Sequence, residues 1–270
     1  RSNKAMIDFM ANYLDGHGIQ SNIAPNEDGT KADLIATVGP MVEGGIVLSG
    51  HTDVVPVEGQ NWWNEPFKLV ERDGLLFGRG TCDMKGFIAV VLALVPEILK
   101  LNLRKPLHLV FSYDEEIGCL GAPALIARMI KDVPMPQAAI IGEPSSMKLV
   151  NAHKGVLIFE TVVTGSPAHS SQTHSGVNAI DTAAECIRFL KFRAEKFKED
   201  GSQDERLQPP YNTLSISMIE GGTALNIIPS ECKFTWDCRS IGIGDGELLV
   251  VSRNLKKALK ATTIAKTLIL

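Results

Sequence analysis

The chain has 270 residues, of which 27 are basic and 31 acidic, and its formal net charge is −4 at pH 7. This charge is too small to indicate a nucleic-acid or membrane surface, and no apolar run approaches the ~18 residues of a membrane-spanning helix. The five cysteines are odd in number and lack CxxC spacing, which favours a reducing compartment, the cytoplasm. The length allows one large or two small domains.

Strands and helices alternate in the first part of the chain. Apolar runs at 45–50, 107–112 and 138–141 are typical of strands, and the patterns at 84–100 and 122–131 are typical of helices. Pro96 is expected to kink the first helix or to mark its last turn. The alternation predicts an α/β domain over residues 1–153, with a largely parallel sheet flanked by helices.

The order of elements changes after residue 153. The predicted elements are a strand at 156–164, a helix at 178–197, strands at 214–219 and 231–238, a helix at 246–260 and a strand at 262–270. This β-α-β-β-α-β order is that of the ferredoxin-like split unit. The sequence therefore predicts a second, α+β domain over residues 154–270, with the polar stretch at 199–210 as a solvated loop.

Acidic residues and one histidine follow the predicted strands of the first domain. The group comprises His51, Asp53, Asp83, Glu115, Glu116 and Glu143. Residues just past the strand ends of an open α/β sheet line one crevice, where crowded carboxylates would repel one another unless cations neutralised them. Carboxylate oxygen with imidazole nitrogen suits zinc, with cobalt or manganese as substitutes. The group therefore indicates a metal-dependent hydrolase.

Several ordered motifs contain these residues and extend into the second domain. They are GHTDVVP at 50–56, GRGTCDMKG at 78–86, YDEEIGC at 113–119, GEPS at 142–145, GSPAHSS at 165–171, GGTALNIIP at 221–229 and DCR at 237–239. In this order, and over nearly the whole chain, they resemble the signature of the di-zinc aminoacylase and carboxypeptidase family. The resemblance implies a zinc-hydrolase catalytic domain, into which the ferredoxin-like unit is inserted as a lid and dimerisation domain.

The resemblance also implies a set of metal ligands. Asp83 would bridge two zinc ions, His51 and Glu143 would complete one site, and Glu116 would bind the other ion. The peptide bond between Asp83 and Met84 is expected to be cis. Family members carry a last histidine ligand after the second domain, and this chain also lacks part of the family's first helix. The chain is therefore expected to be truncated at both ends and to lack that ligand.

Catalytic and substrate-binding residues follow from the same resemblance. Asp53 would orient the imidazole of the histidine ligand, and Glu115 would be the general base. His169 would stabilise the oxyanion in the active site of the partner subunit, which implies a homodimer formed through the lid domain. Asn226 and Arg239 would hold the backbone and carboxylate of the substrate.

Within the family, the motifs at 118–121 and 153–155 most resemble those of members that deacetylate N-acetylornithine. The implied reaction gives L-ornithine and acetate, for arginine biosynthesis. One alternative substrate is succinyl-diaminopimelate, or another N-acyl amino acid. A different class of function is a binding homologue without turnover, and the intact pair Glu115 and Glu116 argues against it, because a pure binder would not need the base.

Overall fold

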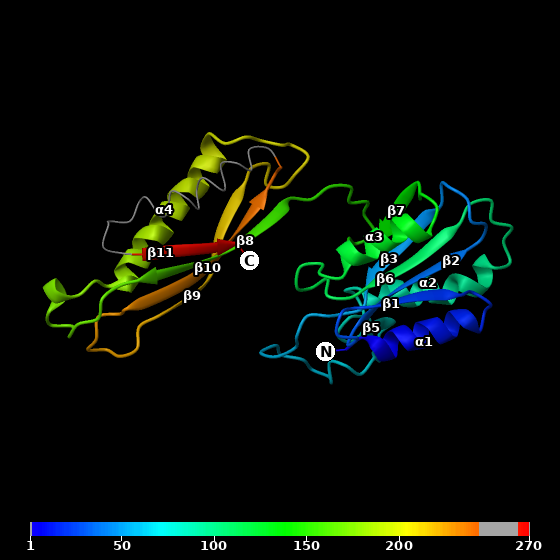
Figure 1. Ribbon diagram of the computed structural model, residues 1–270, viewed down its shortest axis with the longest axis horizontal. Coiled ribbons are helices and arrows are strands. Elements are labelled where there is room, and N and C mark those ends of the chain that lie inside the picture. The colour runs from blue at the N-terminus through cyan, green and yellow to red at the C-terminus, as the bar shows by residue number, and fades with distance from the viewer. Residues whose placement is uncertain (1, 243–263, 270) are drawn as a thin grey trace. The chain divides into compact units, whose positions relative to one another are not determined.

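The computed structural model of the chain describes residues 2–242 and the backbone of residues 264–269 (Figure 1). The chain divides into two compact units, Arg1–Leu149 and Val150–Leu270. Each unit has its own sheet and its own hydrophobic core. Within the described residues, no helix combines the length and the apolar character needed to cross a membrane.

The first unit contains a five-stranded sheet with the order β1-β2-β6-β3-β7. Its strands are β1 (Ser21–Pro25), β2 (Ala32–Val38), β3 (Ile46–His51), β6 (Leu107–Ser112) and β7 (Ala138–Ile141). Strand β3 pairs in parallel with β6 and β7, whereas β2 is antiparallel to both β1 and β6. The prediction of a largely parallel sheet is therefore wrong for β1 and β2, and the sheet is mixed. A short turn joins these two strands, and a short connection of this kind requires antiparallel pairing.

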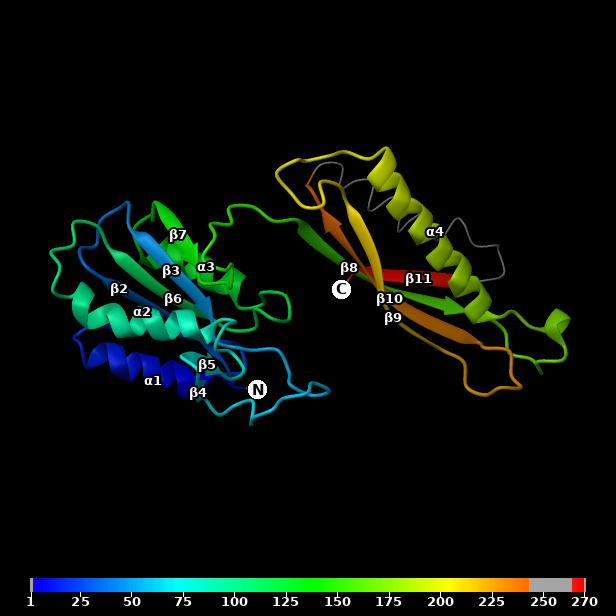
Figure 2. The same cartoon turned by 180° about the vertical axis from the view of Figure 1, so that it is seen from behind.

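Helices cover both faces of this sheet. They are α1 (Lys4–Asp15), α2 (Lys85–Ile98) and α3 (Ala122–Asp132). Successive side chains of a strand point to opposite faces, so Leu34 and Phe111 pack in one core with α1 and α2. Ile35 and Val110 pack in another core with Leu125 of α3. Figure 2 shows α1 and α2 on the same face of the sheet.

The structure confirms some predicted elements of the first unit and adds others. The predicted helices at 84–100 and 122–131 correspond to α2 and α3, and Pro96 lies in the last turn of α2. The predictions did not include α1, β1, β2 or the hairpin of β4 (Val70–Arg72) and β5 (Leu75–Phe77). Helix α1 has a detectable signal, because its buried residues Ile7, Met10 and Leu14 follow helical spacing.

The second unit contains an antiparallel sheet with the order β11-β8-β10-β9. Its elements are β8 (Gly155–Thr164), the 3-10 turn η1 (Thr173–Ser175), α4 (Ala179–Glu199), β9 (Thr213–Gly221), β10 (Glu231–Ser240) and β11 (Ile264–Ile269). Helix α4 packs on the sheet through a core that includes the stacked rings of Phe159 and Trp236, whose centroids are 4.1 Å apart. The four predicted strands and the helix at 178–197 are confirmed. The predicted helix at 246–260 lies outside the described residues.

Candidate metal centre

The ends of three neighbouring strands carry most of the candidate metal ligands. His51 is the last residue of β3, Glu115 and Glu116 follow β6, and Glu143 follows β7. Because β6, β3 and β7 are adjacent and parallel, their carboxyl ends meet at the same edge of the sheet. The structure therefore brings these four residues together at one edge.

Glycines at the strand ends allow α2 to approach this edge. A Cβ atom at Gly50 would lie 2.7 Å from Cε of Met84, and one at Gly142 would lie 2.2 Å from Cδ1 of Phe87. The side chain of Met84 is completely buried in this contact. Asp83 lies two residues before the start of α2 and is thereby carried to the ends of the strands. The peptide bond between Asp83 and Met84 is cis, as the family resemblance predicts.

The donor atoms of the cluster lie close together. Nε2 of His51 is 3.2 Å from Oδ1 of Asp83, 3.6 Å from Oε1 of Glu143 and 3.9 Å from Oε2 of Glu115. Donor atoms of His51, Asp83 and Glu143 all lie within 4.8 Å of one another, and so do those of His51, Glu115 and Glu116. Each set is compact enough for its side chains to share one ion, and the two sets have the imidazole in common.

Burial and the crowded carboxylates shift the pKa values of the residues in the cluster. Burial lowers the pKa of His51, but its hydrogen bond with Asp53 and the charges of Asp53, Glu143 and Glu115 together raise it to about 9. Burial raises the pKa values of Glu116 and Glu143; the charge of His51 acts in the opposite direction, and neighbouring carboxylates add to the rise. Oε1 of Glu116 is buried and has no hydrogen-bond partner in the described part of the chain. A bound divalent cation would neutralise these carboxylates and give that oxygen a partner, so the residues fit a metal site.

Asp53 connects the histidine to the segment after β6. Its carboxylate accepts hydrogen bonds from the backbone N–H groups of Glu115 (3.1 Å) and Glu116 (3.0 Å), and Oδ1 lies 3.4 Å from Nδ1 of His51. The backbone oxygen of Asp53 is also 3.1 Å from Nδ1. Burial raises the pKa of Asp53, but the hydrogen bonds from His51 and the two N–H groups lower it to about 2. Asp53 is therefore ionised, and its contact with the backbone after β6 was not predicted from the sequence.

The structure places the remaining predicted site residues in the second unit. The backbone of His169 forms an isolated bridge with Ile227, and Ser170 N donates to the oxygen of Asn226 at 2.9 Å. His169 and Asn226 therefore lie on paired segments. Arg239 lies on β10, where its Nε donates to Oδ2 of Asp237 at 2.7 Å.

The hydrogen bonds of His169 define its tautomer. Nδ1 accepts a hydrogen bond from the backbone N–H of Ser171 at 3.2 Å and lies 2.8 Å from the hydroxyl oxygen of the same residue. Because a backbone N–H can only donate, Nδ1 is an acceptor, and the proton of the neutral ring lies on Nε2. His169 is exposed, so Nε2–H can donate to a ligand.

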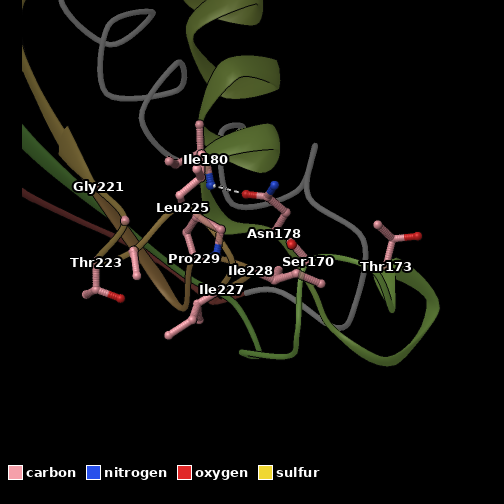
Figure 3. A pocket seen from close by; sticks show the side chains of 12 residues that line it. Ser170, Thr173, Asn178, Ile180, Gly221, Thr223, Leu225, Ile227, Ile228 and Pro229 are labelled. Carbon is pink, nitrogen blue, oxygen red and sulfur yellow. Dashed lines mark hydrogen bonds between the residues drawn. The ribbon is translucent and has the colours of Figure 1, made fainter.

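A pocket of about 430 Å³ lies beside the start of α4 (Figure 3). Its lining includes Ser170, Asn178, Ile180, Thr223 and Ile227. Oδ1 of Asn178 accepts a hydrogen bond from the backbone N–H of Ile180 at 2.9 Å and so caps the helix. The predicted substrate-binding residues of this unit are not among the residues that line the pocket.

Residues 47–240 match the sequence model of peptidase family M20/M25/M40. The chain is 37% identical over 242 residues to acetylornithine deacetylase of Pasteurella multocida (strain Pm70). The aligned residues make up 89% of this chain and 62% of the relative. Acetylornithine deacetylase of Proteus mirabilis (strain HI4320) is also 37% identical over 242 residues, which are 89% of this chain and 61% of that protein. The chain thus spans less than two thirds of the length of these curated relatives.

Solved structures share the fold. An M20 family metallo-carboxypeptidase from Sulfolobus solfataricus has a TM-score of 0.74 at 17% identity, over 97% of this chain and 72% of that one. A dinuclear metal binding peptidase of the M20 family from Bacillus subtilis has a TM-score of 0.60 at 17% identity, over 98% of this chain and 67% of that one. The sequence match begins in β3 and ends in β10, so it includes the clustered donors and the residues of the second unit described above. By this match, the chain belongs to peptidase family M20/M25/M40.

Proposed function

We propose that the protein is a metal-dependent amide hydrolase that removes the acetyl group from N2-acetyl-L-ornithine. The products are L-ornithine and acetate, as in arginine biosynthesis. The observation that carries the proposal is the convergence of one imidazole and four carboxylates, from His51, Asp83, Glu115, Glu116 and Glu143, at one edge of the sheet. Relatives that are 36–37% identical and bear the name acetylornithine deacetylase support the choice of substrate.

The cluster offers the ligands for two zinc ions, with cobalt or manganese as substitutes. Asp83 would bridge both ions, His51 and Glu143 would complete one site, and Glu116 would bind the second ion. Two observations favour this distribution: the closest carboxylate to Nε2 of His51 belongs to Asp83, and Glu116 has a buried oxygen without a partner among the described residues. When bound, the ions would acidify a water molecule and polarise the carbonyl group of the amide.

Glu115 is the proposed general base. It takes a proton from the water molecule as the water oxygen forms a bond to the acyl carbon, and it delivers the proton to the nitrogen as the carbon–nitrogen bond breaks. Its carboxylate lies at the cluster, with Oε2 3.9 Å from Nε2 of His51. Asp53 positions the base through the backbone N–H group of Glu115 and the imidazole through its contacts with Nδ1.

The second unit is proposed to be an inserted ferredoxin-like lid that also forms the homodimer. His169 would donate from Nε2–H to the oxyanion, a role that its tautomer supports. Asn226 and Arg239 would hold the substrate backbone and carboxylate, and the bond from Arg239 to Asp237 restrains the guanidinium. We also propose a cytoplasmic location, which the odd number of cysteines and their lack of CxxC spacing support.

The test is a measurement of kcat/KM for the zinc-loaded protein on N-acetylornithine, N-succinyl-diaminopimelate and other N-acetyl and N-succinyl amino acids. We expect the highest kcat/KM with N-acetylornithine. A higher kcat/KM with N-succinyl-diaminopimelate would show that the protein removes a succinyl group and not an acetyl group. If no N-acyl amino acid is hydrolysed but one still binds, the protein is a binding homologue.

A further inference from the structure

The segment 113–119, which we call the base loop, carries both the proposed base and a proposed metal ligand. It belongs to no helix or strand. Two of its residues that are not glycine have left-handed backbone conformations, Asp114 with φ 56° and Cys119 with φ 58°. Such conformations are uncommon outside glycine, although aspartate tolerates them better than most residues. Contacts from other parts of the unit are therefore needed to hold the loop in this path.

Lys31 makes such a contact at the start of the base loop. Its Nζ lies 2.6 Å from both carboxylate oxygens of Asp114. The two side chains are only 20% and 14% exposed, so solvent ions screen their attraction less than that of a surface pair. Lys31 itself is fixed, because its backbone N–H donates to Oδ1 of Asn26 at 2.9 Å and its backbone oxygen accepts from Asn26 N at 3.0 Å.

A second anchor holds the next two residues of the loop. The carboxylate of Asp53 accepts hydrogen bonds from the backbone N–H groups of Glu115 and Glu116. Asp114, Glu115 and Glu116 are consecutive, so Lys31 and Asp53 bind adjacent residues of the same short segment. Lys31 contacts the loop through its ion pair with Asp114, which is not a proposed metal ligand.

We propose that Lys31 is a positioning residue for the base loop. Its ion pair with Asp114 fixes the backbone ahead of Glu115, so that the carboxylate of Glu115 lies at the cluster and that of Glu116 reaches its metal site. Lys31 acts through Asp114 and touches no reacting atom. The inference rests on the proposed roles of Glu115 and Glu116.

The first experiment compares Lys31→Met with Lys31→Arg in the intact, zinc-loaded protein, with N-acetylornithine as substrate. Lys31→Met should lower kcat by ~10- to 100-fold, the effect expected when a catalytic group is misplaced, while KM changes by less than ~2-fold. Lys31→Arg should recover most of kcat, because the guanidinium can also donate twice to one carboxylate. The matched control is Lys100→Met, which removes an exposed ion pair with Glu97 and should leave both constants unchanged. An equal kcat in Lys31→Met and wild type would overturn the proposal.

A double-mutant cycle with Asp114→Asn tests whether the two residues act as a pair. Asparagine also tolerates a left-handed conformation, so this variant removes the charge without a new backbone conflict. The double variant should be no slower than the slower single variant. Losses of kcat that multiply would show that Lys31 acts independently of Asp114. If Lys31→Met does not fold, Asp114→Asn alone must show the same loss of kcat at unchanged KM.

Hydrogen exchange in the metal-free protein gives a readout that does not depend on activity. The amides of Glu115 and Glu116 should exchange faster in Lys31→Met than in wild type and in Lys100→Met. Unchanged exchange in the base loop would refute the positioning role. If the wild type hydrolyses no N-acyl amino acid, the proposed function fails, whereas the exchange rates still decide whether Lys31 holds the loop.

Discussion

Asp33 is predicted to reduce the stability of the first unit progressively as the pH rises from about 4 to about 7. It lies in β2, is only 2% exposed, and its Oδ1 has no hydrogen-bond partner within the described residues. Burial raises its pKa from 3.8 to about 7, although a backbone hydrogen bond with Tyr113 and the charge of Arg128 act in the opposite direction. The folded protein therefore holds this carboxyl in its neutral form over a pH range in which the unfolded chain ionises it.

The sign of the effect follows from proton linkage. Between the unfolded pKa and the folded pKa, the folded state binds more protons, so its stability falls as the pH rises from about 4 to about 7. At ~1.36 kcal/mol for each pKa unit, the full loss has an upper limit of about 4 kcal/mol. In Asp33→Asn this loss is removed, but the buried amide brings donors of its own, which cost ~1–3 kcal/mol if they are not satisfied. We expect a net gain of ~1–3 kcal/mol at pH 8 and no gain at pH 4.5.

Urea unfolding followed by circular dichroism measures this prediction in the metal-free protein at pH 4.5, 6 and 8. The free energy of unfolding of the wild type should fall between pH 4.5 and pH 8 by more than that of Asp33→Asn. Asp8→Asn replaces an exposed aspartate of α1 and should have the same pH dependence as the wild type. Equal pH dependences in the wild type and Asp33→Asn would refute the reasoning, because Asp33 would then ionise with an ordinary pKa.

Four further outcomes are expected. Glu115→Gln should lower turnover by at least ~100-fold with unchanged zinc content, and near-normal turnover would remove Glu115 from the mechanism. Asp83→Ala should lose more bound metal than Glu116→Ala by atomic absorption, because a bridging carboxylate serves both ions; full occupancy in Asp83→Ala would contradict the bridge. Chelation should abolish hydrolysis and added zinc or cobalt should restore it, whereas activity in metal-stripped protein would exclude a metal mechanism. Gly142→Ala should lower the free energy of unfolding by ~1–3 kcal/mol through the clash with Phe87, and an unchanged urea midpoint would show that α2 can shift to accommodate the methyl group.

The sequence predicted the cluster even though it missed two strands, which make the sheet mixed. The alternation of strands and helices suggested a largely parallel sheet, but β2 is antiparallel to both β1 and β6. The cluster depends on β6, β3 and β7, which are adjacent and parallel, and on the segment before α2 that carries Asp83. His51 is the last residue of β3 and Glu143 follows β7, so their convergence required only that part of the topology. The error therefore lies in strands that do not carry the cluster.

The contacts that support the base loop had no sequence signal. Lys31 and Asp114 are 83 positions apart, and Asp53 lies 62 positions before Glu115. Hydrophobic periodicity shows which face of an element is buried, but it carries no information about which polar side chain a remote loop will meet. The supports of the base loop therefore became visible only in the folded structure, whereas the residues that they support stand in recognisable motifs.

The different surroundings of Glu115 and Glu116 favour different roles for these neighbours. Both lie within reach of His51 as potential metal donors, so proximity does not separate them. Glu116 has an oxygen that is buried without a hydrogen-bond partner in the described part of the chain, and a metal ion would compensate for that burial. The side chain of Glu115 is 37% exposed, as a group must be if it is to exchange protons with water and a departing amine. Because Asp53 binds the backbone N–H groups of both residues, the loss of its carboxylate would disturb the proposed base and the proposed ligand together. Glu115→Gln would instead remove the proposed base and leave the proposed ligand in place.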